Sequence, residues 1–112
     1  MTLSEEKEGA ILILTLNGKI DMEGARVFGE RIVQILDAGE QSILLDFTEV
    51  PYINSSGLHA LILVANRLTK SGGTLILAGV GEQVYKALKI SGLAPMLTIQ
   101  PTRADALATF SE

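Results

Sequence analysis

Hydrophobic residues along the chain fall into short unbroken runs separated by stretches with helical spacing. Three runs rich in Leu, Ile and Val indicate buried strands: residues 10–16 (AILILTL), 42–47 (SILLDF) and 74–79 (TLILAG). Unbroken apolar strands are typical of a sheet that is covered by helices. Two weaker segments are also predicted strands, namely residues 96–99 (MLTI), and residues 3–7 as a partner of the first strand.

The stretches between these runs predict four helices. The first lies between Asp21, as its N-cap, and Gly39, as its stop, and its apolar face is Ala25, Phe28, Ile32, Ile35 and Leu36. The second runs from Ser55 to Lys70 behind an Asn54 cap, and its inner stripe is Leu58, Leu61, Ile62, Ala65 and Leu68. Residues 82–90 and 104–110 predict the other two, and glycines at 72, 73 and 92 supply further stops.

The order of these elements predicts the fold class. Strands alternate with helices after an initial strand pair, which favours an α/β fold with a mixed, largely parallel sheet. A chain of 112 residues can bury one core but is too short for two. Residues 1–112 are therefore predicted to form a single domain.

Composition and charge narrow the class of protein. Hydrophobic residues make up 47% and charged residues 20% of the chain, as in globular proteins. The net charge is −4 and the nine basic residues are scattered, which argues against direct contact with nucleic acid or an anionic membrane. No apolar run approaches the roughly 20 residues needed to cross a bilayer. Together with the acidic start (MTLSEEKEG) and the lack of cysteine, this predicts a cytoplasmic protein without membrane insertion.

The sequence offers little for catalysis or cofactor binding. His59 is the single histidine, four residues after Ser55 and three after Ser56, but no carboxylate is placed to orient a Ser/His pair. Asp21 and Asp46, both near strand ends, are a weak pair for a metal. The GVGEQV turn at 79–84 lacks the third glycine of a dinucleotide-binding turn and is better explained as a tight connection. No catalytic residue, metal site or cofactor is predicted.

The two serines of the segment YINSSGL (52–58) have a more distinctive position. With Asn54 as the cap, Ser55 and Ser56 fall in the first helical turn, where unsatisfied N–H groups and the helix dipole favour negative charge. A phosphate added there would be partly stabilised and would bring about −1.5 to −2 of charge to the surface. On helix-start chemistry alone, simple helix-start serines without a regulatory role are the more common explanation, since Ser is frequent at helix starts.

Four segments read together resemble the STAS domain: LNGKIDMEGA (16–25), ILLDFTEVPYINSSGLHALI (43–62), SGGTLILAGV (71–80) and ALKISGL (87–93). The chain is most similar to the bacterial anti-sigma factor antagonists, and the resemblance covers nearly its whole length. It implies the STAS fold, a mixed sheet of four or five strands with about four helices packed largely on one face.

The resemblance also implies a partner-switching regulator of transcription rather than an enzyme. In this family the unphosphorylated antagonist binds an anti-sigma factor, itself a serine kinase of the histidine-kinase ATPase type, and so frees the sigma factor. Phosphorylation of a serine at the start of the second main helix dissociates the complex, and a metal-dependent serine phosphatase restores binding. The partners implied for this chain are such a kinase and such a phosphatase.

The resemblance assigns residues to these roles. The family acceptor follows an acidic residue in a pattern like Asp-Ser-Ser/Thr-Gly-Leu, so the acceptor here is Ser55, with Ser56 as the alternative. The residues implied for partner binding are Asp21, Met22, Asn54, Ser56, Gly57, Leu58 and His59. Two of them depart from the family pattern, because Asn54 stands where Asp is usual and His59 where a small residue is usual.

Two other functions stay open. A STAS scaffold subunit of a lipid-transport or stressosome-like assembly would not be switched by phosphate, and the neutral Asn54 suits that alternative. A Ser/His hydrolase would be labelled by a fluorophosphonate probe at Ser55 or Ser56. The sequence does not identify the sigma factor, the kinase or the oligomeric state.

Overall fold

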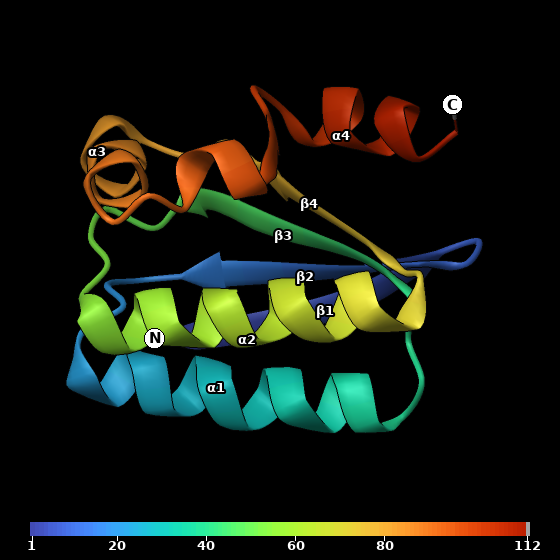
Figure 1. The fold of residues 1–112 in the computed structure, drawn as a ribbon, viewed down its shortest axis with the longest axis horizontal. Helices are drawn as coiled ribbons and strands as arrows, with labels where there is room; N and C mark the ends of the chain where they lie inside the picture. Colours follow the sequence, from blue (N-terminus) through green and yellow to red (C-terminus); the bar gives the residue numbers. More distant parts are fainter. Residues whose placement is uncertain (112) are drawn as a thin grey trace.

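The computed structural model describes residues 1–111 (Figure 1). Within them the chain forms five strands, four α-helices and one short 3-10 helix. In chain order these are β1 (Thr2–Glu8), β2 (Ile11–Asn17), α1 (Met22–Asp37), β3 (Ser42–Glu49), α2 (Ser55–Ser71), β4 (Thr74–Ala78), α3 (Glu82–Ile90), η1 (Ala94–Met96), β5 (Thr98–Gln100) and α4 (Arg103–Phe110). The α/β class and the mixed, largely parallel sheet predicted from the sequence are confirmed.

The sheet has its strands in chain order, β1-β2-β3-β4-β5, with β1 antiparallel to β2 and the remaining pairs parallel. Because each parallel crossover is right-handed and every step moves in the same direction, α1, α2 and α3 must all lie on one face. Their buried residues join a single core with the inner side chains of β2 and β3. Among residues 1–111, α4 is the helix that contributes to the second core on the opposite face, and Figure 1 draws it on the other side of the sheet from α1 and α2.

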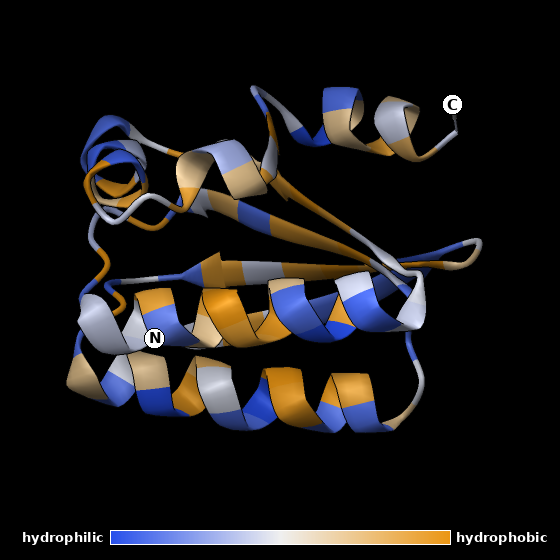
Figure 2. Cartoon of the chain, viewed as in Figure 1, coloured by the Kyte–Doolittle hydropathy of each residue, from blue (hydrophilic) through white to orange (hydrophobic). Residues whose placement is uncertain are grey.

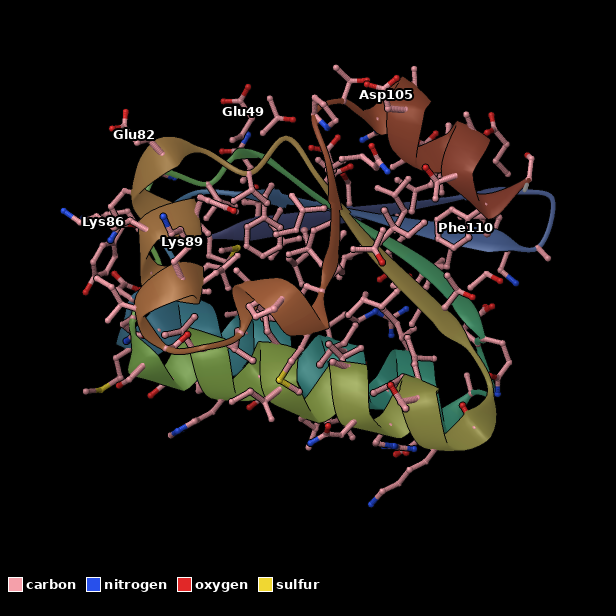
Figure 3. All side chains as sticks on the ribbon, turned by 45° about the horizontal axis from the view of Figure 1, so that its top comes forward. Glu49, Glu82, Lys86, Lys89, Asp105 and Phe110 are labelled. Carbon is pink, nitrogen blue, oxygen red and sulfur yellow. The ribbon has the colours of Figure 1, made fainter. Side chains whose placement is uncertain are left out.

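This arrangement explains the unbroken apolar strands. In β2 and β3, Leu12 and Ile43 point into the large core, whereas Ile13 and Leu44 point into a smaller core under α4. Phe110 of α4 packs against that second core (Figure 3). Figure 2 shows the result, with apolar residues along the middle strands and the inner helix stripes and polar residues on the outer helix faces.

Several predicted boundaries are confirmed, and two predictions are wrong in part. The glycines expected to end helices, Gly39, Gly72 and Gly92, have φ values of 91°, 79° and 79°. The last strand was expected at residues 96–99 but occupies Thr98–Gln100, because Pro95 lies in the first turn of η1, which takes up residues 94–96.

The inner stripe of α2 also differs from the prediction. Its buried residues are Gly57, Leu61, Val64 and Leu68, whereas three predicted members, Leu58, Ile62 and Ala65, are half-buried. The helix is rotated so that Gly57 faces the preceding loops, where its missing side chain permits a close approach. Leu58 and Ile62 still pack against the edge of the core.

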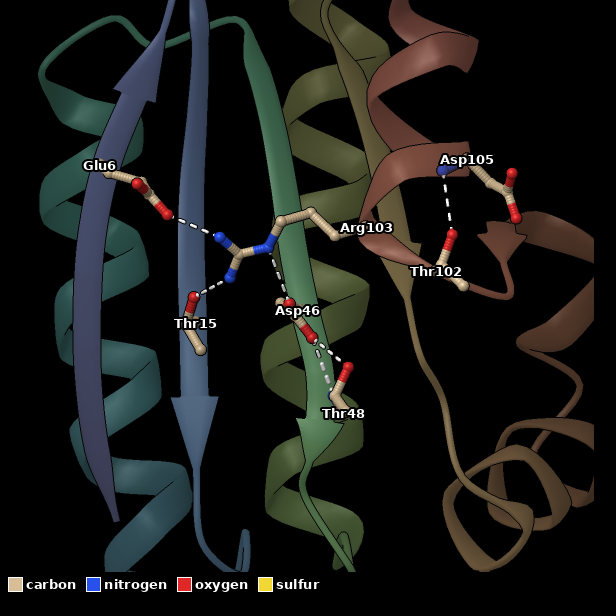
Figure 4. Close-up of polar contacts among 7 residues, drawn as sticks. All are labelled: Glu6, Thr15, Asp46, Thr48, Thr102, Arg103 and Asp105. Carbon is tan, nitrogen blue, oxygen red and sulfur yellow. Dashed lines mark hydrogen bonds and ion pairs between the residues drawn. The ribbon is translucent and has the colours of Figure 1, made fainter.

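An ion pair between the buried Asp46 and the half-buried Arg103 attaches the start of α4 to the face of the sheet opposite α1 and α2. Asp46 of β3 is 6% exposed and accepts a hydrogen bond of 3.0 Å from Nε of Arg103 (Figure 4). Nη2 of Arg103 donates to Oγ1 of Thr15 on β2, and Nη1 contacts Glu6 on β1, each at 2.6 Å. The backbone N–H and the hydroxyl of Thr48 satisfy the other oxygen of Asp46, at 2.9 and 2.6 Å. One side chain thus links α4 to three strands.

These contacts set the ionisation of Asp46. Burial raises the pKa of its carboxyl, but the hydrogen bonds from Thr48 and Arg103 together outweigh burial and hold the pKa below its ordinary value. A carboxyl whose pKa is lower in the folded state stabilises the fold above its unfolded pKa, and that contribution is lost as the pH falls through the folded value.

We therefore expect Asp46→Asn to lower the free energy of unfolding by about 1–3 kcal/mol at pH 7, because it removes the more buried of the two carboxylates that Arg103 binds and leaves Glu6. The difference from wild type should begin to narrow as the pH falls below the ordinary carboxyl pKa of about 4, and it should close only below the lower pKa of Asp46 in the folded state. Urea denaturation at both pH values measures this. Asp105→Asn, at an exposed position in the same helix as Arg103, is the control, and an equal loss from it would contradict the assignment.

Candidate functional site

The first turns of α1 and α2 lie side by side at one end of the molecule (Figure 1). Ile20 and Ile53, which precede the two helices, form a parallel β-bridge. The N–H of Ile20 donates to the carbonyl of Tyr52 at 2.8 Å, and the N–H of Asn54 donates to the carbonyl of Ile20 at 2.9 Å. Two segments that lie far apart in the chain are thereby joined by backbone hydrogen bonds.

The two helix starts are built in the same way. Oδ1 of Asp21 accepts a 2.9 Å hydrogen bond from the N–H of Gly24, and Oδ1 of Asn54 accepts one of the same length from the N–H of Gly57. Both predicted N-caps are therefore confirmed. They differ in charge, because the Gly24 hydrogen bond lowers the pKa of Asp21 and keeps that carboxyl ionised, whereas Asn54 is neutral.

The glycines that follow the caps allow the backbones to approach closely. A Cβ atom on Gly57 would lie 2.5 Å from Cγ2 of Ile20 and 2.7 Å from Cγ1 of Ile53, well inside contact distance. A Cβ atom on Gly24 would lie 2.4 Å from the carbonyl oxygen of Lys19. Gly57 is buried and its neighbour Leu58 is half-buried against the core, so both lie under this surface and support it.

The remaining predicted site residues lie at the protein surface. Asp21, Met22, Ser55, Ser56 and His59 are all exposed, and Asn54 is half-buried by its capping role. Met22 is 80% exposed, the most exposed of the large hydrophobic side chains among the described residues. We call this group, with Tyr52, the helix-start surface.

Tyr52 was not predicted from the sequence. It is 41% exposed and lies in the loop that pairs with Ile20. A second signal was available in the chain itself, because the segments IDMEG (20–24) and INSSG (53–57) share the pattern Ile-Asx-x-x-Gly. That pattern marks two equivalent helix starts, and their equivalence predicts that they have similar caps.

The two serine side chains are available for chemistry. Among residues 1–111, no hydrogen bond engages the hydroxyl of Ser55 or of Ser56. Of the N–H groups that open α2, those of Asn54 and Gly57 are bound, whereas those of Ser55 and Ser56 have no partner in this part of the chain. The first turn of α2 also carries no acidic residue. A negatively charged group on either serine would therefore meet free N–H donors and no carboxylate from the first turn of α2 itself.

The other chemistry considered from the sequence is not assembled. Asp46 points to the opposite face of the sheet, where it binds Arg103, and Asp21 caps α1, so the two carboxylates do not form a pair. Within residues 1–111 no group of His, Asp and Glu is arranged to hold a metal ion. No helix in the same range is long and apolar enough to cross a membrane. Gly79, in the 79–84 turn, packs directly against Thr48 and has a φ of 68°.

Comparison with known proteins identifies relatives along nearly the whole chain. Residues 3–106 match the sequence profile of the STAS domain. BtrV of Bordetella bronchiseptica, named as an anti-sigma factor antagonist, is 30% identical over 98% of this chain and 95% of its own length. The structure of TM1081 from Thermotoga maritima, named in the same way, superimposes with a TM-score of 0.93 at 22% identity, covering 98% and 95% of the two chains. SpoIIAA of Bacillus, solved in its phosphorylated form, gives 0.76 at 20% identity over 97% and 99%.

The glycine contacts lead to a prediction about stability. We expect Gly57→Ala to destabilise the protein by about 1–3 kcal/mol, because the new methyl group must displace Ile20 and Ile53. Gly29→Ala is the matched control, since Gly29 lies within α1 with nothing within 4 Å of its Cβ position. This control should stabilise the protein by up to about 1 kcal/mol through helix propensity. Urea midpoints of the two variants test the contrast, and a neutral Gly57→Ala would contradict the close approach.

Proposed function

The chain belongs to the STAS domain family, and from that membership we propose that it is an anti-sigma factor antagonist switched by phosphorylation of Ser55. The relatives with this name support the general role, which is to bind an anti-sigma factor and so release a sigma factor. Regulatory binding, rather than catalysis, is the activity proposed. In this role the chain works in the cytoplasm, where its partner has access to ATP.

The observation that carries the proposal is the position of the Ser55 hydroxyl. It is exposed and has no hydrogen bond within residues 1–111, and it lies in the first turn of α2 beside the start of α1. The exposed Met22 and Tyr52 provide apolar contact area in the same surface. A surface with apolar anchors and few charges suits a protein partner that buries it.

The proposed modification is a phosphoryl transfer from ATP bound by the partner kinase. The oxygen of the Ser55 hydroxyl attacks the γ-phosphorus and loses its proton, while the bond from phosphorus to the β-γ bridging oxygen breaks and ADP leaves. A serine phosphatase reverses the modification by transferring the phosphoryl group to water. Neither step requires a catalytic residue from this chain.

The phosphate acts through charge. The phosphate adds a charge of about −1.5 to −2 at pH 7. Of the two N-cap residues in this surface, Asp21 is ionised and Asn54 is neutral. Burying this dianion against a partner would require its desolvation, which is costly unless a matching cation is provided. The fold itself need not change, because the free N–H groups at the start of α2 accommodate the phosphate.

Ser55 is favoured over Ser56 by the family pattern alone, since both hydroxyls are exposed. We also propose that the partner contacts the rim of the helix-start surface. The rim residues are Asp21, Met22, Asn54 and His59. A scaffold role without phosphorylation would be indicated if the partner in the native host were a transporter or a large assembly rather than an ATP-binding kinase.

We expect Ser55→Ala to bind the partner kinase like wild type but to take up no phosphate from radiolabelled ATP. Ser55→Asp should weaken binding by at least about tenfold, because it places a permanent charge on the docking surface. Calorimetric titration measures the affinity. Ser56→Ala is the control for the position of the modification and should take up phosphate like wild type. If Ser55→Ala is phosphorylated at the wild-type rate, the acceptor is not Ser55.

A further inference from the structure

The single histidine lies one helical turn beyond the proposed acceptor. Helix α2 is continuous over Ser55–Ser71, so His59 follows Ser55 at the i+4 position and Ser56 at i+3. Side chains with this spacing are neighbours on the helix surface, with Cβ atoms about 5–6 Å apart. Helical side chains also lean toward the N-terminus, which directs the imidazole back toward the turn that contains Ser55. His59 and both serines are exposed.

No carboxylate competes for this imidazole. Helix α2 contains no Asp or Glu, and its other basic residues, Arg67 and Lys70, lie toward the far end of the helix. On α1, which packs against α2, Arg26 binds both Glu23 and Glu30.

The remaining acids near α2 are also engaged. Asp37 of α1 pairs with Arg67 at 3.0 Å, and Asp21 accepts the cap hydrogen bond. Strand β4, which also packs on α2, has no charged residue. Among residues 1–111, His59 takes part in no ion pair and no side-chain hydrogen bond.

We infer that His59 pairs with the phosphoryl group on Ser55 and makes the charge of the phosphorylated surface depend on pH. This inference rests on the proposed phosphorylation of Ser55. The ring N–H of the protonated imidazole donates to a phosphate oxygen, while the free N–H groups of Ser55 and Ser56 face the same anion. The neutral cap Asn54 adds no charge that would repel the phosphate.

Phosphoserine loses its second proton near pH 6, and imidazole as a chemical class changes charge between about pH 5 and 8. A dianionic phosphate beside a neutral imidazole carries a total charge of about −2. A monoanionic phosphate beside a protonated imidazole is close to neutral in total. The charge that opposes docking is therefore largest above neutral pH and fades as the medium becomes acid. A glutamine at this position would leave the phosphate at about −1 in acid.

Phosphoserine incorporated at position 55 during translation tests the inference without any kinase. Phosphorus NMR of the folded protein follows the second ionisation of the phosphate as a function of pH. We expect the midpoint in His59→Gln to lie about 0.2–0.4 pH unit above that of the protein with His59, because the imidazolium favours the dianion. His59→Lys, which keeps a positive charge, should restore a midpoint at or below the original value. High salt should reduce the difference.

Phosphoserine at Ser4, on the exposed face of β1, is the matched control and should not respond to His59→Gln. If the Ser55 phosphoprotein had the same midpoint with and without the His59→Gln substitution, the inference would be overturned. A shift in His59→Gln that His59→Lys does not reverse would also overturn it, since that would indicate a structural rather than an electrostatic effect. Failure of the kinase to modify Ser55 would instead overturn the proposed function, and would leave the NMR result standing.

Discussion

The backbone bridge between Ile20 and Ile53 is the constraint on which the rest of the candidate site depends. It joins the ends of two β-α connections and makes α1 and α2 begin at the same level. The approach is close enough that Gly57 has no room for a side chain. Because both helices open at this point, one small surface contains two N-caps, two unbonded serine hydroxyls and the exposed Met22. Any change in the bridge would move all of them together.

The strand order of the sheet determines which face each helix covers, and it keeps α4 away from the helix-start surface. Strands added in chain order place α1, α2 and α3 on one face, so the opposite face is left to the short helix α4. Arg103 then fastens α4 through Asp46, Thr15 and Glu6. The stabilising polar network and the proposed docking surface thus lie on different parts of the molecule. Helix α3, with Lys86 and Lys89 pointing outward, borders the same end as the helix starts (Figure 3).

Local signals in the sequence were enough for most of the fold. Helix α3 has the bounds predicted from its spacing and its flanking glycines, and the caps at Asp21 and Asn54 form the hydrogen bonds expected of Asx residues. The rotation of α2, which buries Val64 more deeply than Leu58, could not be predicted, because it depends on the contact of Gly57 with a loop much earlier in the chain. The Arg103–Asp46 pair spans 57 residues and has no local signature. The acceptor serine itself was assigned by family resemblance, since helix-start geometry treats Ser55 and Ser56 alike.

The most direct test of the central claim is the state of Ser55 in the native host. Peptide mass spectrometry of the protein, isolated from cells with the dependent sigma factor active and from cells with it inactive, locates any phosphoryl group within residues 52–58. Partner switching predicts a phosphoryl group on Ser55 when the sigma factor is inactive and its loss when the factor is active. An unmodified Ser55 in both states, or a phosphoryl group confined to Ser56, would contradict the account.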